Sequence, residues 1–415
     1  MWAFWPPDLT TFKGKCMNVE TAGQPAALVK DADGSATAGA ARVGDNVLLT
    51  GGTGFLGSEI MRRILEAHPR TRLALLVRST TRETARERVE RLLARMFGVA
   101  DAARHSERVD VVEGDISLRG AGMDSERSVR LADRIDHVIH CAASVRFDLA
   151  LEVARRDNTE GTRNVLAFAE RLPRLARFDY IGTAFVAGDR RGIIREDDLD
   201  VGQRFLNSYE QTKMEAEKLV RDFAQRHPTA IYRPSIVVGS SKTGETTTFQ
   251  GFYQGLVFYR RLFAGKIVVL LPADPYTPLD IVPVDYVVDA LFALIASGKS
   301  IGGCFHLTSG PGKTCTFDEI LKMLADFTGV KQPPYVSKRA YELLLRPVLK
   351  TVYFWDSRVD VARKAETYMP YCWSNLIFDK ARIDAALEGS GIEVPHARSY
   401  FVKLLEYQAK AMKIA

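Results

Sequence analysis

Tyr209 and Lys213 are the residues whose types and spacing most directly suggest chemistry. They stand four positions apart in the stretch SYEQTK. On a helix this spacing places both side chains on one face, one turn apart. A tyrosine hydroxyl ordinarily has a pKa of about 10, and an ammonium beside it is expected to lower that pKa by stabilising the phenolate. The pair could then act as a general acid or base beside a carbonyl. A solvated surface pair is the alternative.

Thr183 is the third candidate for chemistry. It lies in YIGTAFVAG, near the end of a strand predicted over residues 177–186. Ligands of open α/β sheets bind at the carboxyl ends of the strands. The Thr183 hydroxyl could therefore donate a hydrogen bond to a substrate oxygen, whereas a threonine chosen for its strand propensity is the alternative. Thr183, Tyr209 and Lys213 are our predicted catalytic residues.

A glycine-rich turn predicts where a phosphate binds. In NVLLTGGTGFLGSEI, Gly51, Gly54 and Gly57 lie between a short apolar strand and the start of a helix. Glycines allow a tight turn and a close approach of the backbone to a pyrophosphate. The helix start offers free N–H groups and the positive end of its dipole. This position between strand and helix favours a dinucleotide site over an ordinary loop.

The residue after the second strand indicates which dinucleotide binds. An acidic residue there would bind the ribose hydroxyls of NAD, but the strand 73–78 ends in Arg78. A guanidinium suits a 2′-phosphate, so the sequence predicts NADPH, with a solvated strand-end charge as the alternative. Asp115, at the end of the third strand, is placed to meet the adenine amino group. A turn or helix-capping aspartate is its alternative role.

The elements that must position these residues alternate between strand and helix. Strands are predicted over residues 46–50, 73–78, 108–115, 136–143, 177–186 and 230–239, with helices over 57–67, 81–97, 158–171 and 208–225. This rhythm predicts an α/β fold, a doubly wound parallel Rossmann sheet, with a smaller, mainly helical C-terminal substrate region.

The expected division of the chain follows from this pattern. Residues 1–44 form a largely mobile N-terminal tail, and 45–240 form the NADP-binding Rossmann domain. Residues 241–329 are mixed segments that bind substrate and complete the Rossmann sheet, and 330–415 form the helical C-terminal region. The aromatic stretch 249–263 would suit a long acyl chain, with ordinary core as the alternative.

Composition narrows the class of protein. The 415 residues carry a formal net charge of +6 and five cysteines, none of them in a CxxC pair. This predicts neither a metal site nor a disulfide framework. Lysine and arginine form no stripe with interleaved aromatics, so nucleic acid is not expected, and a cytoplasmic location fits. The stretch 341–355 is predicted to be an amphipathic helix against the core or an acyl pocket, with contact to a membrane surface as the alternative.

The order of the motifs resembles a known family. TGGTGFLG, HCAA, YEQTK and RPSIVVG match the extended short-chain dehydrogenases/reductases across residues 46–240. CAASVRFDLALEVARRDNTEGTRNVLAFA and NSYEQTKMEAE are similar to the fatty acyl-CoA reductases (male sterility domain) and to the thioester-reductase domains of carboxylic acid reductases and peptide synthetases. The likeness continues to about residue 295, and YMPYCWSNLIFDKARIDAAL resembles the small C-terminal domain of fatty acyl-CoA reductases.

The resemblance implies roles for particular residues. Thr183, Tyr209 and Lys213 would be catalytic, and Tyr209 and Lys213 would also contact the cofactor. The other cofactor contacts would be Gly51, Thr53, Gly54, Phe55, Leu56 and Gly57 at the pyrophosphate, Ala142 and Ala143 beside the adenosine and nicotinamide ribose, and Pro234 and Ile236 behind the nicotinamide amide.

The activity that the resemblance implies is NADPH-dependent reduction of an acyl thioester. The acyl group would be carried on CoA or on a carrier protein, and the product would be an aldehyde, with further reduction to an alcohol left open. Arg146 and Phe147 of SVRFD would lie near the thioester, and a surface-loop arginine is the alternative. His140 and Cys141 are adjacent on a strand and so point to opposite faces, which makes Cys141 a packing residue rather than a nucleophile.

Two other functions remain open from the sequence. One is a ketone or hydroxysteroid reductase, or a sugar-nucleotide epimerase, of the same extended family. Arg78 argues against an NAD-using epimerase. The other is a non-catalytic NADPH-binding scaffold, which would be expected to have lost Tyr209 or Lys213.

Overall fold

The computed structural model describes residues 43–257, 270–347 and 367–412. Nearly all of the expected N-terminal tail lies outside the described residues. The same holds for 258–263 of the aromatic stretch and 348–355 of the predicted amphipathic helix.

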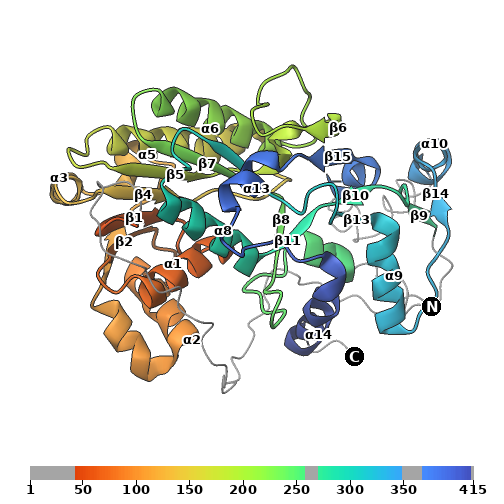
Figure 1. The fold of residues 1–415 in the computed structure, drawn as a ribbon, viewed down its shortest axis with the longest axis horizontal. Helices are drawn as coiled ribbons and strands as arrows, with labels where there is room; N and C mark the ends of the chain where they lie inside the picture. The colour runs from red at the N-terminus through yellow and green to blue at the C-terminus, as the bar shows by residue number, and fades with distance from the viewer. Residues whose placement is uncertain (1–42, 258–269, 348–366, 413–415) are drawn as a thin grey trace.

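The described chain is built around one parallel sheet (Figure 1). Within the described residues this sheet has seven strands, and every neighbouring pair is parallel. Their order across the sheet is β12 (Cys304–Leu307), β7 (Thr229–Pro234), β5 (Arg177–Ile181), β4 (His137–His140), β1 (Asn46–Thr50), β2 (Arg72–Val77) and β3 (Val109–Glu113).

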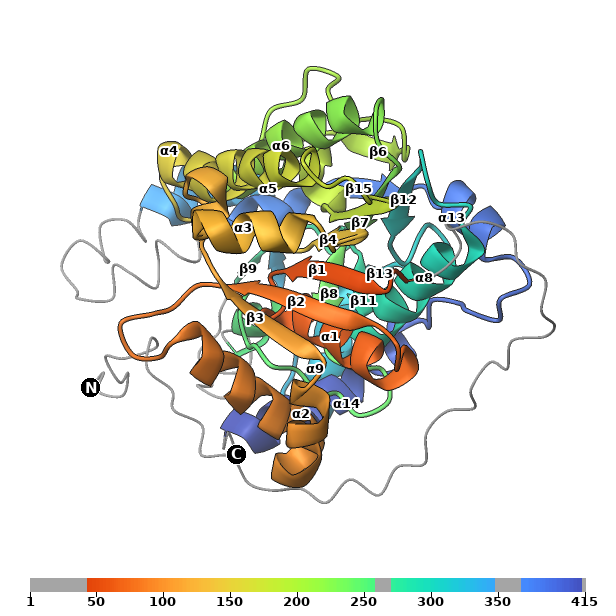
Figure 2. The same cartoon turned by 90° about the vertical axis from the view of Figure 1, so that its left-hand side faces the viewer.

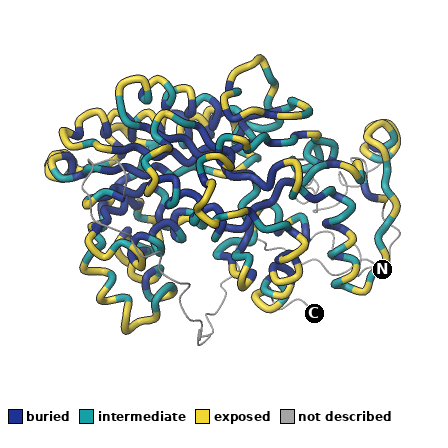
Figure 3. The backbone as a smooth tube through the Cα atoms, viewed as in Figure 1, coloured by how far each residue is buried: buried dark blue, intermediate teal, exposed yellow. Residues whose placement is uncertain are grey.

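Helices cover both faces of this sheet. On one face lie α3 (Ser125–Ala132), α5 (Gly161–Ala169) and α6 (Ser208–Ala224), and on the other lie α1 (Phe55–Ala67), α2 (Ala85–Ser106) and α8 (Val284–Ser297). Each set packs its apolar side chains into a separate hydrophobic core. Figure 2 shows α1 and α2 together on one side of the β1–β2–β3 half of the sheet. Figure 3 shows the strands as the most continuously buried part of the backbone.

The strand order confirms the predicted doubly wound Rossmann fold. From β1 the chain runs outward through β2 and β3, then returns to β4 on the other side of β1 and continues to β5, β7 and β12. The order therefore reverses between β1 and β4, which is where α/β sheets of this kind bind ligands. Strand β1 has the sequence NVLLT, and its last four residues are buried, as expected for a strand covered on both faces.

The strand predicted over 230–239 is in fact two strands. β7 ends at Pro234 in the main sheet, and β8 (Ile236–Val238) pairs instead with β11 (Ile281–Pro283). Proline lacks the N–H that a central strand must donate. The side chain of Ser235 donates to Asp280 Oδ1 at 2.6 Å, which holds the chain at the break.

The described residues after 330 are mainly helical, as predicted, and they also pack back onto the sheet domain. Strand β15 (Asn375–Phe378) pairs with β6 (Arg191–Ile194), and α13 (Ala381–Leu387) packs against α8. Ile383 and Leu387 of α13 join the core that α1 and α8 share. The C-terminal region thus returns to the Rossmann body, and the periodicity of its sequence could not predict this because strand pairing is a long-range contact.

The remaining elements form the side of the molecule at the right of Figure 1 and the connections around the sheet. They are η1 (Arg119–Gly122), α4 (Leu151–Ala154), the π-helical turn η2 (Arg155–Glu160), η3 (Ala184–Ala187), β9 (Leu271–Pro272), β10 (Pro278–Leu279), β13 (Cys315–Thr316), α9 (Phe317–Thr328), β14 (Tyr335–Val336), α10 (Lys338–Ala340), η4 (Tyr341–Leu345), η5 (Met369–Trp373), η6 (Ala397–Ser399) and α14 (Phe401–Met412).

Candidate active site

The glycine turn connects β1 to α1 with almost no free space. Gly51 has φ +76°, and a Cβ there would lie 2.6 Å from the backbone nitrogen of Ala142. A Cβ on Gly57 would lie 2.1 Å from the carbonyl oxygen of Gly51. The turn therefore requires glycine at both positions, and it brings the start of α1 against the loop that follows β4.

The start of α1 fits an anion. Its N-cap is Gly54, which provides no side-chain cap, and the first turn contains no acidic residue. Thr53, Phe55 and Leu56 lie on this turn, as the sequence predicted. The helix thus presents uncapped N–H groups and the positive end of its dipole to whatever lies above the turn. This is the geometry that holds a pyrophosphate.

Two arginines meet near this turn, although the sequence indicated one. Arg78 follows β2 directly, is largely exposed and lies 3.6 Å from Asp115. Arg88 on α2 donates to the carbonyl oxygen of Arg78 at 2.6 Å and to Thr53 Oγ1 at 3.2 Å. Burial and the neighbouring Arg78 lower the pKa of the Arg88 guanidinium. Such crowded positive charge favours an anion, and Arg88 was missed because α2 carries many arginines without a pattern to separate them.

Asp115 is held in a turn at the end of β3. Its Oδ1 accepts from the backbone nitrogen and the hydroxyl of Ser117, at 2.9 Å and 2.8 Å. Although burial opposes it, these bonds and the charge of Arg78 lower the pKa of the carboxyl, which is therefore ionised at neutral pH. It can accept a hydrogen bond from an amino group above the sheet.

Tyr209 and Lys213 both lie on α6, one turn apart, as predicted. The helix begins at Ser208 because Asn207 caps it, accepting from the backbone nitrogen of Glu210 at 3.0 Å. Thr183 lies just beyond β5 as the N-cap of η3, and its side chain is near enough to the Tyr209 hydroxyl to lower the pKa of that hydroxyl. The three predicted catalytic residues are therefore brought together beside the carboxyl end of β5.

The expected lowering of the Tyr209 pKa is wrong for the protein by itself. Burial raises the pKa of Tyr209 to about 12, and the nearby Thr183 side chain opposes this only in part. The Lys213 ammonium donates to the carbonyl oxygen of Ile181 at 2.9 Å and lies 4.4 Å from the centre of the Tyr180 ring. Burial lowers the pKa of Lys213 to about 8. Tyr209 is thus a protonated hydroxyl, suited to donate a proton rather than to accept one.

Asn158 is a further residue of the site that sequence reasoning missed. It is buried in η2, where Oδ1 accepts from the backbone nitrogen of Ser144 at 2.7 Å and Nδ2 donates to Thr212 Oγ1 at 3.0 Å. It therefore connects the loop after β4 to the helix that carries Tyr209 and Lys213. An asparagine inside a helix that is otherwise amphipathic is the signal that could have found it.

Aromatic rings surround Tyr209. Phe147, from the loop after β4, stacks on the Tyr209 ring with centroids 5.5 Å apart. Tyr368 and Tyr371 approach Phe147 to 5.3 Å and 5.7 Å, so residues near η5 lie beside the predicted catalytic helix. Arg146 is exposed and pairs with Asp148, as a surface-loop arginine would. Of the two SVRFD residues singled out, Phe147 is the one that reaches the site.

His140 and Cys141 do not form a nucleophilic pair. His140 is bonded on both ring nitrogens, to Thr50 at 2.7 Å and Thr162 at 3.0 Å, and burial lowers its pKa to about 3. Burial also raises the pKa of the Cys141 thiol to about 11. A neutral imidazole and a protonated thiol agree with the prediction that Cys141 is a packing residue.

The last predicted cofactor residues lie along the same edge of the sheet. Ala142 and Ala143 follow β4, and the Ala142 nitrogen donates to Thr50 Oγ1 at 3.2 Å. Pro234 ends β7, and Ile236 opens β8 immediately after the break described above.

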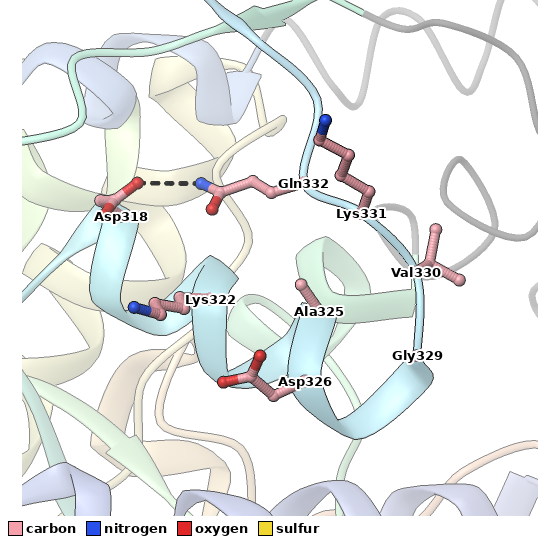
Figure 4. Close-up of a pocket in the computed structure, with 8 residues that line it drawn as sticks. All are labelled: Asp318, Lys322, Ala325, Asp326, Gly329, Val330, Lys331 and Gln332. Carbon is pink, nitrogen blue, oxygen red and sulfur yellow. Dashed lines mark hydrogen bonds between the residues drawn. The ribbon is translucent and has the colours of Figure 1, made fainter.

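Two cavities lie away from these residues. One of about 600 Å³ is formed by α9 and the loop before β14, between side chains such as Asp318, Lys322 and Lys331 (Figure 4). The other, of about 320 Å³, lies at the amino ends of β1, β2 and β3, opposite the ligand-binding edge. Among the described residues, no helix is long and apolar enough to span a membrane.

Comparison with known proteins gives a consistent picture. The NAD-binding family model described as "Male sterility protein" matches residues 49–291. Fatty acyl-CoA reductase 1 of Xenopus laevis is 30% identical over 285 residues, which are 60% of this chain and 54% of that protein. A fatty acyl-CoA reductase of Drosophila melanogaster is 28% identical over 277 residues, 60% of this chain and 53% of that protein. The chain therefore spans about half the length of these curated relatives.

A solved structure covers more of the chain. The terminal R domain from the myxalamid PKS-NRPS biosynthetic pathway has a TM-score of 0.74 and 27% identity, with 91% of this chain and 93% of that chain covered. The likeness therefore extends beyond the Rossmann sheet into the C-terminal region.

Proposed function

The chain belongs to the NAD-binding family of male sterility proteins, and from this premise we propose that it is an NADPH-dependent reductase that converts an acyl thioester to an aldehyde. The observation that carries the proposal is that the loop after β4 contacts both the glycine turn and Tyr209. The backbone carbon of Cys141 lies 2.8 Å from where a Cβ of Gly51 would stand, and the Phe147 ring stacks on the Tyr209 ring with centroids 5.5 Å apart. One loop thus joins the proposed phosphate turn to the proposed proton donor.

The side chains support acid catalysis. When bound, the nicotinamide cofactor supplies the hydride. Tyr209 holds its proton at neutral pH and delivers it to the carbonyl oxygen, with Thr183 as a second donor to the same oxygen. The resulting hemithioacetal expels the thiol and leaves an aldehyde. Lys213 lies one turn from Tyr209 and would bind the nicotinamide ribose hydroxyls.

Two guanidiniums support NADPH over NADH. Arg78 and Arg88 meet next to Thr53 in the glycine turn, where the 2′-phosphate of a bound dinucleotide would lie. Arginine recognises phosphate by paired hydrogen bonds. Asp115 would accept from the adenine amino group. Gly51, Gly54 and Gly57 would line the pyrophosphate with Thr53, Phe55 and Leu56, and Ala142, Ala143, Pro234 and Ile236 would line the nicotinamide half.

The substrate class follows from the relatives. Fatty acyl-CoA reductases are named for an acyl-CoA substrate, and the R domain belongs to a PKS-NRPS pathway. We assign residues 45–240 to cofactor binding, 241–329 to a mixture of substrate binding and sheet completion, and 330–415 to a C-terminal region in which the residues near η5 border the substrate. The thioester would be presented on CoA or on the phosphopantetheine of a carrier protein.

The decisive test is turnover by the purified chain. NADPH oxidation would be followed optically with acyl-CoAs of graded chain length and with an acyl carrier-protein thioester, and NADH would run in parallel. We expect release of free thiol in step with NADPH oxidation and an aldehyde as the first product. NADPH oxidation by ketones or steroids with no thiol released from any thioester would replace this function with the ketone-reductase alternative.

A further inference from the structure

We propose that Tyr371 is a positioning residue of this active site: it binds the first turn of α6 and thereby orients Tyr209 toward the substrate carbonyl. The inference rests on the proposed function. Tyr371 lies in η5, and its partners on α6 are more than 160 positions away in the sequence. It does not bond to Tyr209 directly and acts through the residues on either side of it.

The Tyr371 hydroxyl connects both ends of the helix cap. Asn207 Nδ2 donates to the hydroxyl oxygen at 2.6 Å, and the hydroxyl donates to Glu210 Oε1. Glu210 is fully buried, and its Oε2 accepts from the backbone nitrogen of Leu206 at 2.9 Å. Asn207 and Glu210 enclose Tyr209 in the sequence. The orientation of the Tyr209 backbone is therefore set by a hydroxyl from the C-terminal region.

The Tyr371 ring contacts the other walls of the site. It lies 5.7 Å from Phe147, which stacks on Tyr209, and it meets Phe185 edge-on at 5.8 Å. The backbone nitrogen of Phe185 donates to Thr183 Oγ1 at 3.3 Å. The Tyr371 ring thus contacts Phe147, which stacks on Tyr209, and Phe185, which is bonded to Thr183. The Tyr371 hydroxyl binds Asn207 and Glu210, which lie on either side of Tyr209 in the sequence. Small displacements of reacting groups lower the reaction rate by large factors. Loss of the Tyr371 contacts is therefore expected to lower the turnover rate.

A second tyrosine in the same half of the chain provides a matched control. The Tyr335 hydroxyl also lies between an amide and a carboxylate: Gln332 Nε2 donates to it at 2.5 Å, and it donates to Asp318 Oδ1 at 3.0 Å. Figure 4 shows Gln332 and Asp318 joined beside the cavity at α9. The chemistry of the bonds is alike, but their location is not, because these partners belong to α9 and its following loop. Tyr335→Phe therefore measures the loss of such a hydroxyl where no predicted site residue is involved.

The test compares Tyr371→Phe with Tyr335→Phe in the full chain. For Tyr371→Phe we expect kcat to fall about tenfold, since one hydrogen bond to a buried carboxyl is lost, with the KM for NADPH unchanged. Hydrogen exchange followed by mass spectrometry should be faster across residues 206–211 in the variant. Tyr335→Phe should leave kcat and this exchange at wild-type values.

A second variant keeps the test independent of how Tyr371→Phe folds. Asn207→Ser retains a side-chain oxygen to cap α6 but removes the amide that binds Tyr371, so it should reproduce the fall in kcat. The inference is overturned if exchange across 206–211 is unchanged in Tyr371→Phe, or if kcat and KM for NADPH change together as in general destabilisation. The exchange measurement needs no turnover. It therefore judges the contact even if the wild-type chain reduces no thioester, an outcome that would refute the proposed function instead.

Discussion

The proposed cofactor end and the proposed reacting end of this site are built in different ways. The cofactor end consists mainly of one contiguous turn, residues 50–57, pressed against the loop after β4. The reacting end collects Phe147, Asn158, Thr183 and Tyr209 from four segments and Tyr371 from a fifth. Backbone geometry determines the first, and buried side-chain contacts determine the second. This difference indicates that residues close in the sequence can form a binding turn by themselves, whereas contacts from distant segments are needed to orient a proton donor.

The largest expected effect separates chemistry from cofactor binding. Tyr209→Phe removes the proposed proton donor but keeps the ring that stacks on Phe147. We expect kcat to fall by roughly 10²–10⁴-fold, the range typical of general acids, with NADPH affinity unchanged within error. Steady-state kinetics and cofactor titration measure the two quantities. Retained turnover would remove Tyr209 from the mechanism, and the control is Tyr335→Phe.

Disrupting the glycine turn should mainly lower NADPH affinity, the quantity that Tyr209→Phe leaves unchanged. In Gly57→Ala the new Cβ would stand 2.1 Å from the Gly51 carbonyl oxygen, so the turn must shift. Overpacking of this kind costs about 1–3 kcal/mol, and we expect weaker NADPH binding by roughly tenfold or more. Gly312→Ala, where a Cβ would meet open space, is the matched control. Equal NADPH affinity in the two variants would contradict the close approach.

A variant of Arg88 tests recognition of one group of the cofactor, the 2′-phosphate of NADPH. Arg88→Ala should raise the KM for NADPH about tenfold, the loss of one charged hydrogen bond to phosphate, and leave kinetics with NADH nearly unchanged. Arg86→Ala is the control, since Arg86 lies on the same helix and pairs at 4.0 Å with Glu90. An equal loss with both cofactors would mean that Arg88 supports the turn and does not recognise the 2′-phosphate.

The smallest effect concerns the seam between the sheet and the C-terminal region. Glu196 is buried and accepts from the backbone nitrogens of His306 in β12 and Arg382 in α13, at 2.8 Å and 2.9 Å. Burial raises the pKa of Glu196 to about 7 from an ordinary 4.5. A raised pKa means that the folded state favours the protonated carboxyl, so the stability it contributes is complete below pH 4.5 and is lost as pH rises toward 7.

Denaturant unfolding at several pH values tests this seam. The free energy of unfolding should decline between pH 4.5 and 7 by an amount on the order of 1 kcal/mol from this group. Glu196→Gln should reduce that slope, whereas the exposed Glu126→Gln should keep it. An unchanged slope in Glu196→Gln would show that this carboxyl does not titrate between those values.

Much of the fold, and the tight glycine turn after β1, could be predicted from the sequence. Alternating apolar runs and amphipathic stretches gave the parallel sheet and its helices because strand burial and helix periodicity are local properties of a sequence. The turn at Gly51 and Gly57 could be recognised in the sequence. The contacts that require glycine there are made between residues close in the sequence or at the ends of adjacent strands. The shared face of Tyr209 and Lys213 followed from helix geometry alone.

The tertiary structure decided the features that depend on residues far apart in the sequence but close in space. The strand breaks at Pro234 because β8 pairs with β11 instead of continuing in the main sheet, and β15 pairs with β6. The periodicity of the sequence does not specify either pairing. Arg88 became a candidate phosphate contact because α2 turns it onto Arg78. The pKa of Tyr209 rose, against the expectation from Lys213, because burial outweighs a charge that is directed at the Ile181 carbonyl. Desolvation and contacts across the fold are sums over the surroundings in space, and neighbours in the sequence do not determine them.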